Sequence, residues 1–239
     1  MAIMRYEPWG LLNQLQRELK LSQDEKTGEG SVATAEWAPA VDIKEEADKD
    51  YQLAAGISQD VEADDSILEL TKARLPWLVL ALFGGFISVH VLGIFEPVME
   101  LHPELFFFTP LIAAMAGNVG VQSSAIIVQG LANNTIIGPV IERLLKELSL
   151  SLLNGVILSV ILLAGSYFLL GYEIHVGYTV SIALLSVIIM ASLIGTFIPI
   201  ILNKYGVDPA LATGPFITTS NDILGILTYF TIAKIILGI

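Results

Sequence analysis

Apolar segments alternate with short polar stretches along the chain after residue 74. Five of these segments are long enough for a helix that crosses a bilayer, since about 20 residues span roughly 30 Å of hydrocarbon. They cover residues 75–95, 105–132, 149–171, 176–202 and 211–237. The pattern therefore predicts an all-α membrane protein with five transmembrane helices.

The composition agrees with this division. The chain of 239 residues is 54% hydrophobic and 15% charged, with a mean hydropathy of +0.70, whereas soluble domains are about 45–50% apolar. Most charged residues precede residue 75, so we expect a short acidic head, residues 1–74, and a five-helix transmembrane domain, residues 75–239. The chain contains no cysteine, which excludes disulfides and thiolate metal sites.

Basic and acidic residues follow different spans. Arg74 precedes the first span, Arg143 and Lys146 lie between the second and third, and Lys204 lies between the fourth and fifth. The other two loops have no Lys or Arg and contain the acidic residues Glu96, Glu100, Glu104 and Glu173. Since cytoplasmic loops carry the excess of Lys and Arg, this predicts a cytoplasmic N-terminus and an outside C-terminus. The first ten residues lack the regions of a signal peptide, so the head is expected to stay in the cytoplasm.

The head has too few large apolar side chains to form a complete domain by itself. Near its end, the stretch DVEADDSILEL contains a capping box, in which Ser66 begins a helix and Glu69 follows three residues later. We therefore expect a lightly ordered cytoplasmic tail that leads into the membrane.

The second apolar segment carries a polar patch near its middle. Asn118 and Gln122 are four residues apart and share a helix face, while Gly117 and Gly120 permit close backbone approach. Ser123 follows directly. Polar groups in a membrane helix face a bundle interior or a water-filled path, so the patch fits either helix packing or the lining of a pore.

The fifth segment contains Asp222, the only carboxylate deep within a predicted span. A carboxylate at this depth costs about 2.5–3.5 kcal/mol and normally has a partner or a function. No basic residue of the body is suitably placed as a partner, and helical spacing gives it polar neighbours at Thr218, Thr219 and Asn221. Pro215 is expected to kink the helix just before them. We interpret Asp222 as a cation site; the alternative is a protonated or hydrogen-bonded structural Asp.

The candidate ligands are all oxygen atoms, which suit hard divalent cations such as Mg²⁺, Ca²⁺ or Mn²⁺. Mg²⁺ retains much of its water and is typically held by one or two carboxylates, so one Asp per chain suits Mg²⁺ where two chains meet around one pore. An acidic outer mouth is predicted at Glu96, Glu100 and Glu104, where negative charge would concentrate cations. For each of these three residues taken singly, solvation of a loop is the simpler explanation.

Four motifs resemble the membrane domain of MgtE-type magnesium transporters: ARLPWL at 73–78, PLIAAMAGNVGVQS at 110–123, LLNG at 152–155 and DPALATGPFITTSNDILG at 208–225. The resemblance covers about 70–239. It implies a homodimeric Mg²⁺ channel of the inner membrane whose path is lined by the second and fifth helices, with Asp222 and Asn118 at the ion. The chain departs from the family pattern at Ala116, where a glycine is usual, and at Gln129, where arginine is frequent nearby.

The head differs from that family. Its 74 residues are too few for the usual cytoplasmic Mg²⁺-sensing domains. Instead, RYEPWGLLNQLQREL and ATAEWAPAVDIKEEADK resemble the N-terminal arm of a small heat-shock protein over residues 1–49. This predicts a fusion, with the join near residues 47–51, in which the first part has no complete domain.

The predicted function is Mg²⁺ transport through a homodimeric pore in the membrane, with lipid and divalent cation as partners and no nucleic acid. The ligand types leave Mn²⁺, Co²⁺ and Ca²⁺ open as further ions. The histidines, His90, His102 and His175, are scattered without ligand or catalytic spacing, which argues against an enzyme. The alternatives are a proton- or sodium-coupled carrier that uses Asp222, and a purely structural membrane partner.

Overall fold

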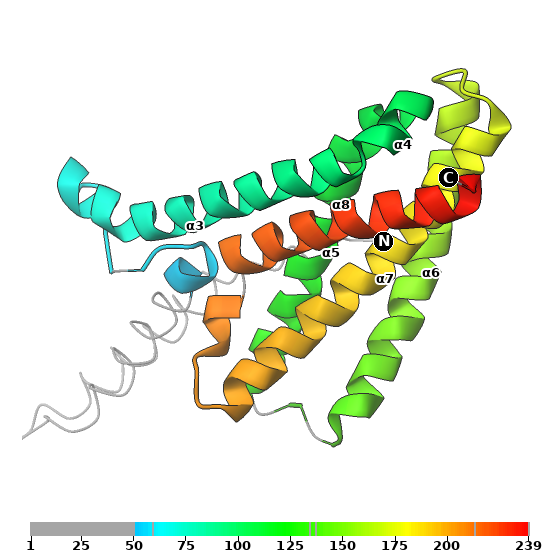
Figure 1. Cartoon of the computed structure of the whole chain (residues 1–239). Coiled ribbons are helices and arrows are strands. Elements are labelled where there is room, and N and C mark those ends of the chain that lie inside the picture. Colours follow the sequence, from blue (N-terminus) through cyan, green and yellow to red (C-terminus); the bar gives the residue numbers. More distant parts are fainter. Residues whose placement is uncertain (1–50, 59, 134, 137, 213, 239) are drawn as a thin grey trace, which may run out of the picture. The chain divides into compact units, whose positions relative to one another are not determined.

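The structure is a computed structural model that describes residues 51–58, 60–133, 135, 136, 138–212 and 214–238 (Figure 1). These residues all belong to one unit of the chain, Glu45–Ile239. The predicted fusion and its small heat-shock arm at 1–49 lie outside the described residues, so they stay predictions.

The described residues contain helices and no strand. The α-helices are α3 (Ile67–Ile94), α4 (Glu96–Leu101), α5 (Glu104–Ala132), α6 (Val140–Phe168), α7 (Ile174–Lys204) and α8 (Pro215–Leu237), and a short 3₁₀-helix, η1 (Pro209–Ala212), precedes α8. All except α4 and η1 are long and apolar enough to cross a membrane, which gives five candidate spans. The predicted all-α fold with five transmembrane helices is confirmed.

The first helix begins earlier than its apolar run. α3 starts at Ile67 instead of 75, because Ser66 and Glu69 form the predicted capping box: the Ser66 hydroxyl accepts from the Glu69 amide, and the Glu69 carboxylate accepts from the Ser66 amide at 3.1 Å. The box therefore belongs to the first spanning helix itself and not to a separate helix in the head.

Two further helix starts differ from the prediction. α6 begins at Val140 instead of 149, so Arg143 and Lys146 lie in its first two turns and not in a loop. The polar residues there are good helix formers and continue the helix beyond the apolar run. α8 begins at Pro215 itself, so the expected kink at Pro215 was wrong. Proline is compatible with the first turn because the first amides of a helix have no intrahelical acceptor.

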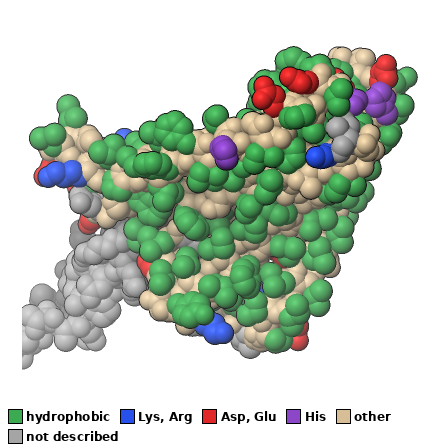
Figure 2. Space-filling view, viewed as in Figure 1, with side chains coloured by type: hydrophobic (Ala, Val, Ile, Leu, Met, Phe, Trp, Pro, Cys, Tyr) green, Lys and Arg blue, Asp and Glu red, His purple; other side chains and the backbone are tan. Residues whose placement is uncertain are grey.

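The spans pack around α7. This helix contacts α5, α6 and α8, while α8 also lies against α5 and α3; Figure 1 shows α3 running along α8. Large apolar side chains remain exposed along α3 and α6 and cover much of the face in Figure 2. Such an apolar surface is suited to contact with lipid chains. Together with the five candidate spans, it identifies a multi-pass membrane protein.

A short segment before α3 is seated on the first turn of α8. Gly56 and Gly214 both have positive φ, 78° and 63°. A Cβ on Gly214 would overlap the Ala54 carbonyl oxygen, and one on Gly56 would overlap the Pro215 ring. Ser58 also ties this segment to α3, because its amide and its hydroxyl both donate to the Ala73 carbonyl at 3.0 Å. This segment, residues 51–58, is called the lead-in, and close contacts attach it to both α8 and α3.

Candidate ion site

Asp222 lies two turns into α8 and faces the backbone of α5. A Cβ placed on Gly117 would lie 3.3 Å from Asp222 Oδ1 and 3.2 Å from Thr218 Cγ2. Glycine therefore lets the α5 backbone approach the carboxylate closely. The structure brings together Gly117 and Asp222, which the sequence analysis had placed in one site from two separate segments.

An open cavity of about 450 Å³ adjoins this contact between α5 and α8. Its polar lining consists of Asn118, Gln122, Thr218 and Asp222. Asn118 and Gln122 are exposed and lie one turn apart on α5, as expected from their spacing. The cavity therefore gathers a carboxylate, a hydroxyl and two amide oxygens, all of which are ligands that hard cations prefer.

A second cavity, of about 420 Å³, reaches Asp222 from the side of α3. Thr218 and Thr219 of α8 line it together with small residues of α3, among them Gly84 and Ser88. Asp222 is consequently accessible along two faces of α8, and Thr219 belongs to the α3 side and not to the α5 side.

Asp222 forms no ion pair or hydrogen bond with any residue that the structure describes, and no three His, Cys, Asp or Glu side chains among these residues are arranged so that they could hold a metal ion. One chain thus offers a single carboxylate on one side of an open cavity. Such an arrangement can hold a cation that keeps most of its water, but cannot enclose a dehydrated one.

Three predicted pore-lining residues, Asn221, Gly120 and Ser123, line neither cavity. Asn221 is 0% exposed, and neither atom of its side-chain amide has a hydrogen-bond partner among the described residues. Its amide nitrogen rests against Gly120, where a Cβ would overlap it. Gly120 in turn touches Gly195 of α7, again without space for a side chain. Asn221 and Gly120 therefore lie at a three-helix contact behind the cavity.

Ser123 is also buried, and it reveals a carboxylate that the sequence analysis missed. Its hydroxyl donates to Glu147 Oε1 of α6 at 2.6 Å, and Glu147 is only 5% exposed. Asp222 is therefore not the only carboxylate within the helical body. Glu147 was assigned to a loop because hydropathy alone set the start of the third span. The unbroken run of helix-forming residues at 140–148 was the available signal.

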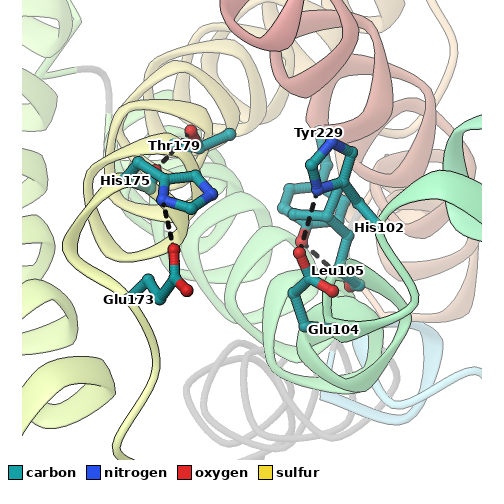
Figure 3. Close-up of polar contacts among 7 residues, drawn as sticks. All are labelled: His102, Glu104, Leu105, Glu173, His175, Thr179 and Tyr229. Atoms are coloured by element: carbon teal, nitrogen blue, oxygen red, sulfur yellow. Dashed lines mark hydrogen bonds and ion pairs between the residues drawn. The ribbon is translucent and has the colours of Figure 1, made fainter.

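The predicted acidic mouth surrounds α4. Glu96 and Glu100 lie in this helix and Glu104 lies in the first turn of α5. Glu104 is paired, because its carboxylate meets His102 Nδ1 at 3.0 Å (Figure 3). No pattern in the sequence indicated α4 or this pair.

The other histidines have distinct positions. His175 pairs with Glu173 at 3.1 Å at the start of α7, as Figure 3 shows, and the nearby Tyr229 hydroxyl donates to the Leu105 carbonyl at 2.9 Å. His90 is exposed on α3, four residues before its end. The two histidine–glutamate pairs are local contacts at helix ends, whereas the Tyr229 bond joins α8 to α5. In the described part of the chain, no histidine ring is bonded to a nucleophilic side chain.

Five apolar helices define the chain as a multi-pass membrane protein, and the Asp222 carboxylate lies unpaired in a cavity between two of them. The family model for MgtE, described as a divalent cation transporter, matches residues 109–232, which include nearly all of α5 to α8. The chain belongs to the MgtE divalent cation transporter family.

Curated relatives match over a longer region. The chain is 40% identical over 189 residues to the magnesium transporter MgtE of Bacillus subtilis. The aligned region covers 79% of this chain and 42% of that protein. It is 34% identical over 195 residues to the magnesium transporter MgtE of Enterococcus faecalis, covering 80% of this chain and 42% of the relative. A similar match to the Thermus thermophilus protein of the same name has 34% identity over 169 residues, covering 70% of this chain and 37% of the relative. The chain therefore spans about two-fifths of the length of these relatives.

Proposed function

We propose that this chain conducts Mg²⁺ across the cell membrane through a pore shared by two copies, with Asp222 and Asn118 at the ion. The observation that carries the proposal is the unpaired Asp222 carboxylate, which lies against the Gly117 backbone in a cavity lined by Asn118 and Gln122. Membership of a divalent cation transporter family and relatives named magnesium transporters support it.

The chemistry of the cavity favours a hydrated divalent cation. Asp222 supplies the charge, while the amide oxygens of Asn118 and Gln122 and the Thr218 hydroxyl accept hydrogen bonds from water bound to the ion. Mg²⁺ gives up water reluctantly and is commonly held in this way. Mn²⁺ and Co²⁺ have similar hydrated shapes and are expected to compete for the same oxygen atoms.

Two copies would complete the site. One chain contributes a single carboxylate beside an open cavity, which leaves half of the ion's surroundings without protein. A two-fold interface brings the same surface patch together from both sides, so a second copy would add a second Asp222 and a second Asn118. The resulting pair of carboxylates balances the charge of a divalent cation.

The charge distribution supports an orientation with the N-terminus in the cytoplasm. Arg143 and Lys146 lie at the start of α6, and Lys204 is the last residue of α7, so these basic residues share one end of the bundle. The opposite end carries Glu96, Glu100 and Glu104, near α4, where acidic side chains gather in Figure 2. The positive-inside rule places the basic end in the cytoplasm, and the acidic end would attract cations outside.

Ion flux into liposomes tests the proposal directly. Purified protein reconstituted in vesicles that contain a Mg²⁺-sensitive dye is expected to pass Mg²⁺ down its gradient in sodium-free buffer of equal pH on both sides. A proton- or sodium-coupled carrier would require one of those gradients. Flux that disappears without them would favour the carrier, and an absence of Mg²⁺ flux under all conditions would reject the transport proposal.

Cysteine crosslinking tests the shared site. Asn118 is exposed at the cavity, so Asn118→Cys in this cysteine-free chain is expected to give dimers with a short bifunctional reagent. Millimolar Mg²⁺ is expected to protect the cysteine, and Na⁺ is not. Val160→Cys is the control, because Val160 is 60% exposed on α6, a helix that lines neither cavity at Asp222. Equal crosslinking of both variants, or crosslinking of Asn118→Cys that ignores Mg²⁺, would contradict a shared ion site.

A further inference from the structure

The buried carboxylate of Glu147 has a single direct partner among the residues that the structure describes. Its hydrogen bond from the Ser123 hydroxyl is 2.6 Å long, within the usual range for an O–H···O bond. Arg143 precedes it by one turn of α6, but these two residues form no ion pair in the described part of the chain, and Arg143 Nε itself has no hydrogen-bond partner there. The carboxylate is therefore directed at α5 and not at the nearest cation.

This hydrogen bond joins two helices that have different principal neighbours. α5 packs on α7 and α8, whereas α6 packs on α7. Polar side chains that bond between membrane helices hold them in one relative position, since a buried polar group in hydrocarbon has few alternative partners. Glu147 thus connects the outer helix of the bundle directly to the helix that carries Asn118 and Gln122.

Ser123 directly follows Gln122, which lines the cavity with Asp222. A rotation of α5 about its axis that breaks the Ser123–Glu147 bond would also move Gln122 and Asn118 away from Asp222. We propose that Glu147 is a positioning residue for the ion path, which fixes the rotation of α5 through Ser123 so that Asn118 and Gln122 face Asp222. The proposal rests on the proposed Mg²⁺ path for its functional part, while its structural part is measurable without ion flux.

Hydrogen–deuterium exchange of the α5 peptides that span 119–132 tests the structural part on full-length protein in detergent. Glu147→Met removes the acceptor at similar size, and Ser123→Ala removes the donor. Each is expected to increase exchange about threefold to tenfold, the range given by the loss of one interhelical hydrogen bond. The double variant is expected to match either single variant, because both substitutions break the same bond. Glu147→Gln retains an acceptor oxygen and is expected to stay within about twofold of the wild type.

Ser151→Ala is the matched control. Ser151 is 2% exposed and lies one turn after Glu147 on α6, but its hydroxyl donates to the Leu148 carbonyl of its own helix at 3.0 Å. Its loss is expected to leave α5 exchange unchanged. Additive effects in the double variant, or an equal effect of Ser151→Ala, would show general loosening of the bundle and would overturn the proposal.

Mg²⁺ flux tests the functional part. Glu147→Met and Ser123→Ala are expected to lower maximal flux about threefold to tenfold, because Asn118 and Gln122 no longer face Asp222. Glu147→Gln is expected to conduct as the wild type does. If Glu147→Gln keeps α5 protected but loses flux, the charge is required and the positioning role is wrong. If the wild type conducts no Mg²⁺, the proposed function fails, while the exchange series still decides whether Glu147 holds α5.

Discussion

Asp222→Asn is expected to reduce Mg²⁺ flux about a hundredfold or more while leaving the fold and the crosslinked dimer intact. The substitution preserves the size of the side chain and an acceptor oxygen, but it removes the charge that faces Gly117 in the cavity. At about 4–5 Å and an effective dielectric constant of about 20, a carboxylate attracts a unit positive charge by roughly 3–4 kcal/mol, and each 1.4 kcal/mol is roughly a factor of ten in rate. Dye-reported flux in liposomes, compared at equal protein content, measures the change.

Asp208→Asn provides the matched control for the same chemical change. Asp208 is exposed before η1, and its Oδ1 accepts from the Ala210 amide at 2.8 Å. Asparagine keeps this acceptor, so flux is expected to remain near the wild-type value. Wild-type conductance in Asp222→Asn, or equal losses in both variants, would remove Asp222 from the ion path.

Gly120→Ala is expected to destabilise the bundle strongly. The added methyl group would overlap the Asn221 amide and would lie 3.0 Å from Ile217 Cγ2, and Asn221 is fully buried and cannot swing into solvent. Overpacking of this kind costs about 1–3 kcal/mol, which corresponds to a fall of roughly 2–12 °C in the thermal unfolding midpoint. Intrinsic fluorescence of the protein in detergent during heating measures the shift.

Two variants isolate the overlap as the cause. Gly165→Ala lies on α6 with no neighbouring atom within 4 Å, so it is expected to leave the midpoint unchanged or to raise it, because alanine favours a helix. Asn221→Ala combined with Gly120→Ala frees the occupied space and is expected to recover part of the loss. A Gly120→Ala variant that unfolds at the wild-type temperature would show that α5 and α8 separate easily at this contact.

The number of spans was predictable because long apolar runs mark membrane helices, and the capping box at Ser66 was predictable from its spacing. Helix ends were less predictable. A hydropathy profile shows where hydrocarbon begins, whereas a helix ends where its hydrogen bonding and backbone geometry fail. This is why α6 extends through Arg143 and Lys146 and why Pro215 begins a helix instead of bending one.

The site shows the same division between local and tertiary information. Helical spacing correctly placed Asn118 and Gln122 on one face, and the isolated charge of Asp222 drew attention to α8. Spacing within a helix cannot show which face meets another helix, so it could not separate the cavity residues from buried Asn221 and Ser123. The partnership of Ser123 and Glu147 joins residues that are distant in sequence, and only the packing of the helices brings them together.

The contact between the lead-in and the first turn of α8 connects the segment before α3 mechanically to Asp222. Ala54 and Gly56 meet Gly214 and Pro215 with no room for a side chain between them, and Asp222 follows Pro215 by only seven residues, about 10 Å along a helix. A stiff helix transmits a push or pull at its first turn to the next two turns. Tension applied to the polypeptide before Gly56 would therefore displace the first turn of α8 and, with it, the Asp222 carboxylate.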